Sequence, residues 1–376
     1  MTEPVVVIGA SSAGLLTAEL LASRGVPVRV YEQSERLAPA ARSLIVTPAI
    51  GQALGFVPTE AVINRVTRFE LRSNGTLANV MLEDADLIIE RSTLIRLLAD
   101  RASRAGAQLH FGWRFKGFAP GRQGTDVLLS RPGRDGTEQV AARFVVGADG
   151  AQSAVARALG RPSQGQVSVV QARVRQPPGV DPCAAKVWFL PRETPYFYWL
   201  IPESPTTAAI GIADDDAGQA RPKLDGFLSR LGYEAFAYQA ARIAMYGPGS
   251  SPGARMGGAE VLLVGDAAGQ VKVTTVGGTV TGLWGARAAA DAITRASPYR
   301  QELRRVNREL HLHWWIRRLL NRFREEDYSA LLRALNRRVH RILGERNRDV
   351  MAGALWSLIA AQPRLLLLAA RARAGP

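Results

Sequence analysis

Three glycine-rich turns in this chain each follow an apolar strand and each suit a phosphate or sugar ligand. The first runs from Gly9 to Gly14, directly after VVVI and directly before a predicted helix. Gly9 permits a tight turn, and Gly14 lets the helix pack against the strand. The helix N-terminus then offers unpaired N–H groups and a positive dipole end to a pyrophosphate. Ser11 stands in place of the usual middle glycine, and its small side chain still allows close approach.

A carboxylate follows the first turn at the spacing of a dinucleotide site. Glu32 ends the second predicted strand, 18 residues after Gly14. A carboxylate at that place accepts hydrogen bonds from a ribose diol. The simpler alternative is a capped turn beside a surface glutamate. The order of strand, turn, helix, strand and acid favours a Rossmann-type dinucleotide-binding unit.

Two later turns indicate which dinucleotide is bound. The segment GADG, which contains Asp149, ends one apolar strand, and GDAAG, which contains Asp266, follows VLLV. Asp266 can hydrogen-bond a ribityl or ribose hydroxyl. The Gly277-Gly278 turn lets N–H groups at a helix start approach a flavin ring. Each turn alone could be an ordinary strand-to-helix connection, but the ordered set predicts FAD.

The pattern of elements predicts an α/β fold, α+β overall, in three parts. Strand–helix–strand segments predict a Rossmann-type FAD-binding domain formed by residues 1–60, 87–165 and 255–297. Segments rich in β-formers and broken by Pro and Gly predict an inserted, mostly antiparallel substrate domain formed by residues 61–86 and 166–254. Residues 298–376 have amphipathic helical spacing and predict a basic C-terminal helical region.

The composition of the 376-residue chain restricts its chemistry. A single cysteine, Cys183, excludes an internal disulfide and a cluster held by several cysteines. His311 and His313 are two residues apart, which gives no metal signature on a helix, so we predict no metal site. Redox chemistry would then need an organic cofactor. The N-terminus has the pattern of a strand and not of a signal peptide, and no apolar run reaches the length of a membrane span, so we expect a cytoplasmic location.

The three turns, with ERSTL at residues 90–94 between them, resemble the flavoproteins of the para-hydroxybenzoate hydroxylase fold. GDAAGQVKVTTVGG is similar to the geranylgeranyl reductase branch, whose usual motif has Pro and Gly where Val273 and Val276 stand here. YWLIP at residues 198–202 resembles a strand of that branch. The resemblance covers about residues 4–300. At residues 43–45 the chain has SLI where the branch often has Cys-Gly.

The resemblance implies a set of FAD contacts, residue by residue: Ala13, Glu32, Arg42, Ser43, Arg91, Phe115, Asp266, Gly278 and Thr279. The glycine-rich turns add Gly9, Ser11, Gly14, Asp149 and Gly277. We assign no catalytic side chain, because the flavin itself carries the redox chemistry. We expect NAD(P)H as a transient electron donor without a Rossmann unit of its own, and a reduced carrier protein is the alternative.

Aromatic residues gather on the predicted antiparallel sheet at Trp188, Tyr196, Tyr198 and Trp199. Cross-strand packing would explain any one of them. As a set they predict the wall of an apolar substrate pocket, because a flavoenzyme needs a dry site beside the reacting ring. The predicted partner is therefore an apolar small molecule or a lipid-like substrate.

The C-terminal region carries most of the net charge of +15. From Arg300 onward there are 17 arginines and 7 acids. Apolar residues spaced three to four apart between arginines suit a membrane surface, and would place the protein at the inner face of the membrane as a peripheral protein. The alternative is a helical lid on the flavin domain, and the two can coexist. We expect no nucleic-acid partner, because no recognition motif accompanies the charge.

Three functions stay open at this point. The first is an FAD-dependent reductase of carbon–carbon double bonds in a prenyl or other apolar lipid-like substrate. The second is an FAD-dependent monooxygenase that hydroxylates or epoxidises a small natural product. The third is a flavin-free protein that binds a lipid or a partner. The motif around Asp266 and the basic apolar C-terminal region favour the first.

Overall fold

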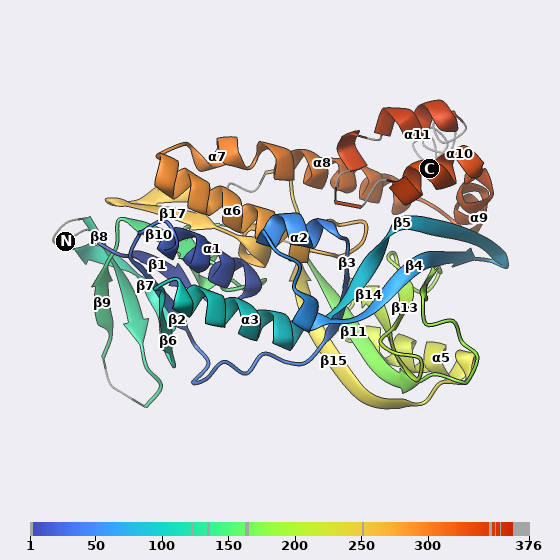
Figure 1. Cartoon of the computed structure of the whole chain (residues 1–376), viewed down its shortest axis with the longest axis horizontal. Coiled ribbons are helices and arrows are strands. Elements are labelled where there is room, and N and C mark those ends of the chain that lie inside the picture. Colours follow the sequence, from blue (N-terminus) through green and yellow to red (C-terminus); the bar gives the residue numbers. More distant parts are fainter. Residues whose placement is uncertain are drawn as a thin grey trace.

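The computed structural model contains two large sheets joined by helices (Figure 1). It describes residues 3–121, 124–133, 136–161, 165–249, 252–345, 348–349, 351–353 and 355–363. The predicted C-terminal region extends to residue 376, and its last part, residues 364–376, lies outside the described residues.

The first large sheet is the Rossmann-type sheet, with six strands in the order β16-β17-β10-β1-β2-β6. All neighbouring pairs are parallel except β16 with β17. The strands are β1 (Val5–Ile8), β2 (Val28–Glu32), β6 (Gln108–Phe111), β10 (Phe144–Gly147), β16 (Gly253–Met256) and β17 (Ala259–Leu263). The three glycine-rich turns follow β1, β10 and β17. Because these three strands are adjacent and parallel, their carboxyl ends bring the turns to one edge of the sheet.

Both faces of this sheet are covered, which explains the continuous apolar runs of its strands. Val5 and Val7 face the helices, and Val6 and Ile8 face the opposite layer, as the alternation of a strand requires. The covering helices are α1 (Ser12–Ala22), α2 (Ala49–Leu54), α3 (Arg91–Arg104) and α6 (Thr279–Arg295). The opposite layer is a three-stranded sheet of β7 (Arg114–Gly121), β8 (Gly124–Ser130) and β9 (Glu138–Ala141), with the short helix α4 (Ala154–Ala158) beside β7.

The second large sheet has eight strands in the order β15-β11-β14-β13-β12-β4-β5-β3. Its neighbours are antiparallel except β12 with β4. The strands are β3 (Ser43–Val46), β4 (Val62–Ser73), β5 (Thr76–Glu90), β11 (Gln166–Arg175), β12 (Ala184–Trp188), β13 (Tyr198–Pro202), β14 (Thr207–Asp214) and β15 (Ala235–Ala244). Helix α5 (Ala220–Leu231) packs on one face through Leu224, Phe227 and Leu228.

The C-terminal helices run from α6 across to the second large sheet (Figure 1). They are α7 (Tyr299–Glu302), α8 (Arg304–Leu320), α9 (Glu325–Ala334), α10 (Arg337–Glu345) and α11 (Leu355–Ala361), with the short 3-10 helix η3 (Met351–Gly353) between α10 and α11. Two other 3-10 helices, η1 (Thr59–Ala61) and η2 (Gly265–Ala268), lie earlier in the chain. Helix α9 contacts β4 and β5, and α10 contacts β5. Within the residues that the structure describes, no helix has both the length and the apolar character that crossing a membrane requires.

This architecture confirms the predicted fold class: a Rossmann-type parallel sheet, a separate and mostly antiparallel sheet, and a helical C-terminal region. The predicted division of the chain into domains stays a prediction. The short strand β3 illustrates why such limits are hard to set, because it lies early in the chain and pairs with β5 of the second large sheet.

Candidate functional site: a flavin groove joined to an apolar cavity

The three glycine-rich turns lie against one another. Gly9 has a φ of 102°, and a β-carbon there would lie 2.6 Å from the carbonyl oxygen of Ala148 in the second turn. A β-carbon on Gly14 would lie 2.3 Å from the carbonyl oxygen of Gly9. A β-carbon on Gly265, in the third turn, would lie 3.2 Å from that of Ala13. The turns therefore converge, and glycine at positions 9 and 14 is a steric requirement of their close packing.

Glu32 and Ser11 hold the first turn in shape. The Glu32 carboxylate accepts hydrogen bonds from the N–H of Ala10 at 2.9 Å and from the N–H of Ser34 at 3.0 Å. Ser11 caps α1, where its hydroxyl accepts a hydrogen bond from the N–H of Gly14 at 3.2 Å. The acid predicted to bind a ribose thus lies directly beside the turn predicted to bind the pyrophosphate.

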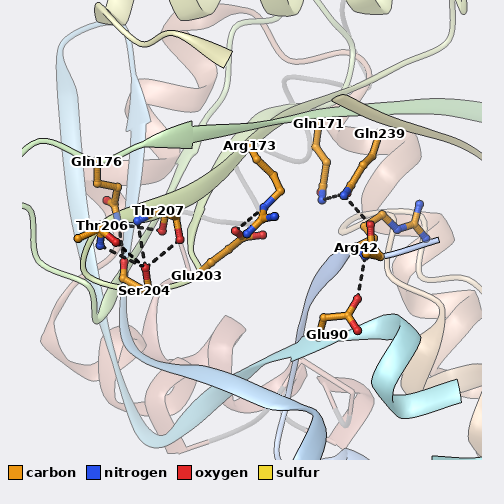
Figure 2. Close-up of polar contacts among 11 residues, drawn as sticks. Arg42, Glu90, Gln171, Arg173, Gln176, Glu203, Ser204, Thr206, Thr207 and Gln239 are labelled. Carbon is orange, nitrogen blue, oxygen red and sulfur yellow. Dashed lines mark hydrogen bonds and ion pairs between the residues drawn. The ribbon is translucent and has the colours of Figure 1, made fainter. Parts of the chain in front are cut away.

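The backbone around Arg42 is fixed from both sides (Figure 2). The Arg42 N–H donates to a Glu90 carboxylate oxygen at 3.0 Å, and the Arg42 carbonyl accepts from the N–H of Arg91 at 2.9 Å. The Gln239 amide donates to the carbonyl of Ala41, so β15 holds the same segment from the other side. With its main chain pinned, Arg42 can direct its guanidinium into the cavity that it lines.

Glu90 also begins α3. Its carboxylate accepts from the N–H groups of Ser92 at 3.1 Å and Thr93 at 2.8 Å. Burial alone would raise the pKa of Glu90, but these donors and the two hydroxyl groups lower it to about 2. Glu90 is therefore an anion that links the N-terminus of α3 to the Arg42 segment.

Asp266 and two arginines form the charged part of the groove. Burial raises the pKa of Asp266 to about 6, although Arg42 and Arg91 both act to lower it. Burial likewise lowers the pKa of Arg42, and the neighbouring Arg91 lowers it further. Asp266 lies beside the Gly277-Gly278 turn, because a β-carbon on Gly278 would be 3.2 Å from an Asp266 carboxylate oxygen. Two half-buried cations and one half-buried carboxylate thus meet where an anionic cofactor with hydroxyl groups would lie.

These residues fit FAD on two observations. Among the described residues, Nε of Arg42 and Oγ of Ser43 are buried and have no hydrogen-bond partner. Buried polar atoms are rarely left without one, so both point to a polar ligand. The second observation is the crowding at Gly278, where a side chain would collide with Val271 at 2.7 Å and close the approach to the turn.

Nine of the predicted FAD contacts line one cavity: Ser11, Ala13, Arg42, Ser43, Arg91, Asp266, Gly277, Gly278 and Thr279. Gly9 and Gly14 lie in the first turn and Glu32 lies beside it, and none of the three lines the cavity. Asp149 does not line the cavity, because its carboxylate accepts from the N–H groups of Ala154 and Val155 at the start of α4. Phe115 is buried against Phe118 in the layer under the Rossmann-type sheet and does not line it either.

The cavity has a volume of about 610 Å³ and extends well beyond the flavin turn. Its polar half is the groove described above. Its other half lies against the second large sheet and the C-terminal helices, and its apolar walls include these side chains: Phe69, Leu71, Val80, Leu82, Val187, Phe189, Phe197, Trp199, Ile201, Ile316, Leu343 and Met351. An apolar chamber is therefore continuous with the flavin groove.

Of the four aromatic residues predicted for the substrate pocket, only Trp199 lines this cavity. Tyr198 is its neighbour on β13 and so faces the opposite side of the sheet. There it stacks on Phe227 of α5, with ring centroids 4.1 Å apart, and Trp188 packs on the same ring. Tyr196 is buried against Val167 and Ala213 and does not line the cavity either. Trp199 lies flat over Gly211, where a β-carbon would be 2.2 Å from its ring.

A buried charged cluster at the cavity wall was missed in the sequence. Lys272 forms an ion pair with Asp349, and both side chains are almost fully buried. The other Asp349 oxygen accepts from the Thr47 hydroxyl at 2.5 Å. Arg348 pairs with the buried Asp86. No local motif marks these residues, because the partners come from segments far apart in the chain.

His313 completes that cluster as a neutral side chain. Burial, followed by the charge of Lys272, lowers the pKa of His313 to about 4. Its Nε2 lies 3.2 Å from the carbonyl oxygen of Arg348, which can only accept, so Nε2 carries the proton. Nδ1 then accepts from the hydroxyl of Thr274. The cavity wall beside the flavin turn is therefore electrically balanced.

The groove and the two-sheet architecture define a flavoprotein, and sequence comparison agrees. The chain belongs to the FAD binding domain family, whose model matches residues 2–296. It is an FAD-dependent oxidoreductase of the group related to the para-hydroxybenzoate hydroxylase fold.

Individual relatives are similar in sequence or in fold. Digeranylgeranylglycerophospholipid reductase 2 of Methanothermobacter thermautotrophicus is 29% identical over 363 residues, which cover 89% of this chain and 92% of that protein. A geranylgeranyl bacteriochlorophyll reductase-like structure from Thermoplasma acidophilum superposes with a TM-score of 0.77 at 18% identity, over 97% of this chain and 98% of that one. The p-nitrophenol 4-monooxygenase of Pseudomonas putida has a TM-score of 0.65 at 17% identity, over 98% of this chain and 96% of that one. At these identities the two structures show the fold alone.

Proposed function

We propose that this protein reduces carbon–carbon double bonds in a prenyl or other apolar lipid-like substrate. The observation that carries the proposal is the apolar chamber that continues directly from the flavin groove. A chamber lined by Phe, Leu, Val and Ile side chains binds hydrocarbon by removing it from water, at about 25 cal/mol per Å². A charged or strongly polar substrate would gain little from these walls.

The names of the relatives support the same chemistry. The relative matched over 92% of its length is a digeranylgeranylglycerophospholipid reductase, and a geranylgeranyl diphosphate reductase of Synechocystis is 25% identical over 85% of this chain. Both names describe reductases of prenyl compounds. We extend only the reaction class and the apolar character of the substrate to this chain.

We propose that the nine cavity-lining residues of the groove hold FAD, with Glu32 behind the first turn. When bound, FAD supplies the hydride for reduction, and NAD(P)H is the donor that we propose for its reduction. The start of α6, at Thr279, directs its positive dipole end into the groove, which favours negative charge there. The apolar walls exclude water from the reacting bond. Arg42 and Arg91 would balance the cofactor's negative charge, and the Lys272–Asp349 pair keeps the cavity wall beside the flavin turn neutral.

The test is a reduction assay under nitrogen. The FAD-loaded protein, reduced with dithionite, is mixed with a geranylgeranyl lipid in detergent, and the product is analysed by mass spectrometry. We expect a product that has gained one hydrogen molecule for each reduced bond. A product that forms only in air and contains added oxygen would instead establish the monooxygenase alternative.

A pair of adjacent residues on β5 tests whether the apolar chamber binds the substrate. Leu82 lines the chamber, whereas Met81 points away from it and is 57% exposed. We predict that Leu82→Asn raises the KM for the lipid about 10-fold, the loss expected for one buried aliphatic side chain. Met81→Asn makes the same kind of change outside the chamber and should leave KM unchanged. Equal effects of the two substitutions would place the substrate elsewhere.

The proposed working place is the cytoplasmic face of a membrane, where such a substrate is found. The charge of the C-terminal region supports this location.

A further inference from the structure

One face of α8 combines positive charge with an exposed tryptophan. Most of its exposed residues recur three to four positions apart, which places them in one row along the helix. We call this row the α8 stripe: Arg304, Arg308, His311, Trp315, Arg318 and Arg322, the last just beyond the helix end. Trp315 lies at its centre and is 58% exposed. A tryptophan this exposed needs an explanation, because the ring has a large apolar area.

Two acids near the α8 stripe, Glu302 and Glu309, are held by other groups. Glu309 is buried, and its carboxylate accepts the N–H of Ala352 at 2.8 Å. Glu302 accepts the Ser297 hydroxyl at 2.7 Å. The stripe itself contains no acid, and the exposed Arg304, Arg308 and Arg318 give it positive charge around Trp315.

The opposite side of α8 is fixed against the protein and reaches the apolar cavity. Val306 and Leu310 belong to the main core, and Trp314 packs against it. His313 and Ile316 line the cavity itself. Helix α8 therefore separates the substrate chamber from the solvent, with the stripe on its outer side.

From this geometry we propose that the α8 stripe docks the protein on an anionic lipid surface, with Trp315 at the headgroup level. Trp side chains favour the membrane–water interface, and arginines near an anionic surface each add to binding. The proposal deepens the proposed function, because a stripe directly outside the chamber would bring the cavity to the membrane that holds a lipid-like substrate. Its test needs no turnover, so it can fail while the reductase activity stands.

The experiment is a flotation assay with the full-length, FAD-loaded protein. The vesicles consist of phosphatidylcholine alone, or of phosphatidylcholine mixed with phosphatidylglycerol. We expect binding to the mixed vesicles, little to the neutral ones, and release by high salt. The double variant Arg308→Ala/Arg318→Ala should bind about 30-fold more weakly. Trp315→Ala should weaken binding to the mixed vesicles and remove the blue shift of tryptophan fluorescence that vesicles cause.

Two matched variants separate the stripe from general charge and exposure. Arg104→Ala/Arg114→Ala removes two exposed arginines from α3 and β7, and Phe236→Ala removes an aromatic side chain that is 52% exposed on β15. Both should bind vesicles as the unchanged protein does, and flavin absorbance shows that every variant is folded. Equal losses in the control variants, equal binding to neutral vesicles, or retention on double-stranded DNA without vesicle binding would overturn the proposal.

Discussion

Asp266 is a carboxyl in the flavin groove with a raised pKa. Burial raises the pKa of its carboxyl to about 6, because the nearby Arg42 and Arg91 do not fully offset the cost of ionising it. Its ordinary value is 3.8. A hydroxyl donor from the ribityl chain or ribose would stabilise the anion and lower this pKa. Folding alone therefore favours the protonated carboxyl, whereas cofactor binding favours the ionised one.

A substitution at Asp266 tests both the pH dependence of stability and the affinity for FAD. Because the folded pKa is raised, the folded flavin-free protein binds a proton that the unfolded chain has lost between about pH 4 and pH 6. Its stability from this group is thus present in acid and falls as pH rises through about 6, by at most about 3 kcal/mol. We predict that Asp266→Asn removes this fall, as urea denaturation of the flavin-free protein on both sides of that range would show. The same variant should bind FAD about 10- to 100-fold more weakly, because a charged acceptor is lost.

Asp149 is a control carboxylate for the Asp266 substitution. It also ends a strand of the Rossmann-type sheet, but its oxygens cap α4. Asp149→Asn should lower the free energy of unfolding by about 1 kcal/mol and leave the Kd for FAD unchanged. If both substitutions weaken FAD binding equally, the assignment of the polar groove is wrong.

The loop between η2 and α6 contains a residue with a strained backbone conformation. Val276 has a φ of 52°, a left-handed conformation that costs a side chain with a branched β-carbon about 1–2 kcal/mol. Its side chain packs against the buried cluster of Val167, Tyr196 and Ala213, and the residue lines the cavity. The position corresponds to the glycine of the usual family motif, so the structure explains why glycine is common there. Valine at this position strains the backbone, but its side chain fills the cavity wall.

This loop contains two valines, Val273 and Val276, and only Val276 is left-handed. The same Val→Gly substitution can therefore be compared with and without backbone strain. At Val276, a change to Gly loses side-chain contacts and adds unfolded-state entropy but relieves the strain, so we predict a change in the free energy of unfolding below about 1 kcal/mol. Val273 is buried in the core and is not left-handed, and its change to Gly should cost about 3 kcal/mol. Urea midpoints of the two variants measure the difference. Equal losses would mean that Val276 is not strained in solution.

How far the sequence predicted these elements depended on whether the signal was local. The three turns and their strands were predictable, because parallel strands buried on both faces appear as short apolar runs closed by glycine. Trp199 was predicted together with Tyr198, although strand alternation places only one of them at the cavity. The parallel pairing of β12 with β4 was not predictable, because it joins segments more than 100 residues apart. Lys272 and Asp349 are 77 positions apart and share no motif, so their pairing required the fold.

Two consecutive residues, Arg348 and Asp349, connect the C-terminal region to the second large sheet and to the FAD-binding part of the molecule. Arg348 pairs with Asp86 of the second large sheet, and Asp349 pairs with Lys272 of the loop before α6. Burial acts to raise the pKa of Asp349, but Lys272 and Thr47 hold it below its ordinary value. The stabilisation by this carboxylate is therefore present above the ordinary carboxyl pKa and is lost in acid. These contacts attach the C-terminal helices over the cavity.

A double-mutant cycle tests this attachment. Lys272→Met leaves Asp349 buried without its cation and should cost about 3–5 kcal/mol, and Asp349→Leu should cost a similar amount by leaving the ammonium unpaired. Lys272→Met/Asp349→Leu leaves neither charge, so we predict a smaller loss than either single change. Arg221–Asp225 is the control pair: both side chains are exposed, at 49% and 46%, and Arg221→Met should cost less than about 1 kcal/mol. Urea denaturation measures each free energy, and limited proteolysis should cut the single Lys272 and Asp349 variants first within the C-terminal helices. Additive losses in the cycle would show that the two side chains do not stabilise one another, and the attachment of the C-terminal helices would then not depend on this ion pair.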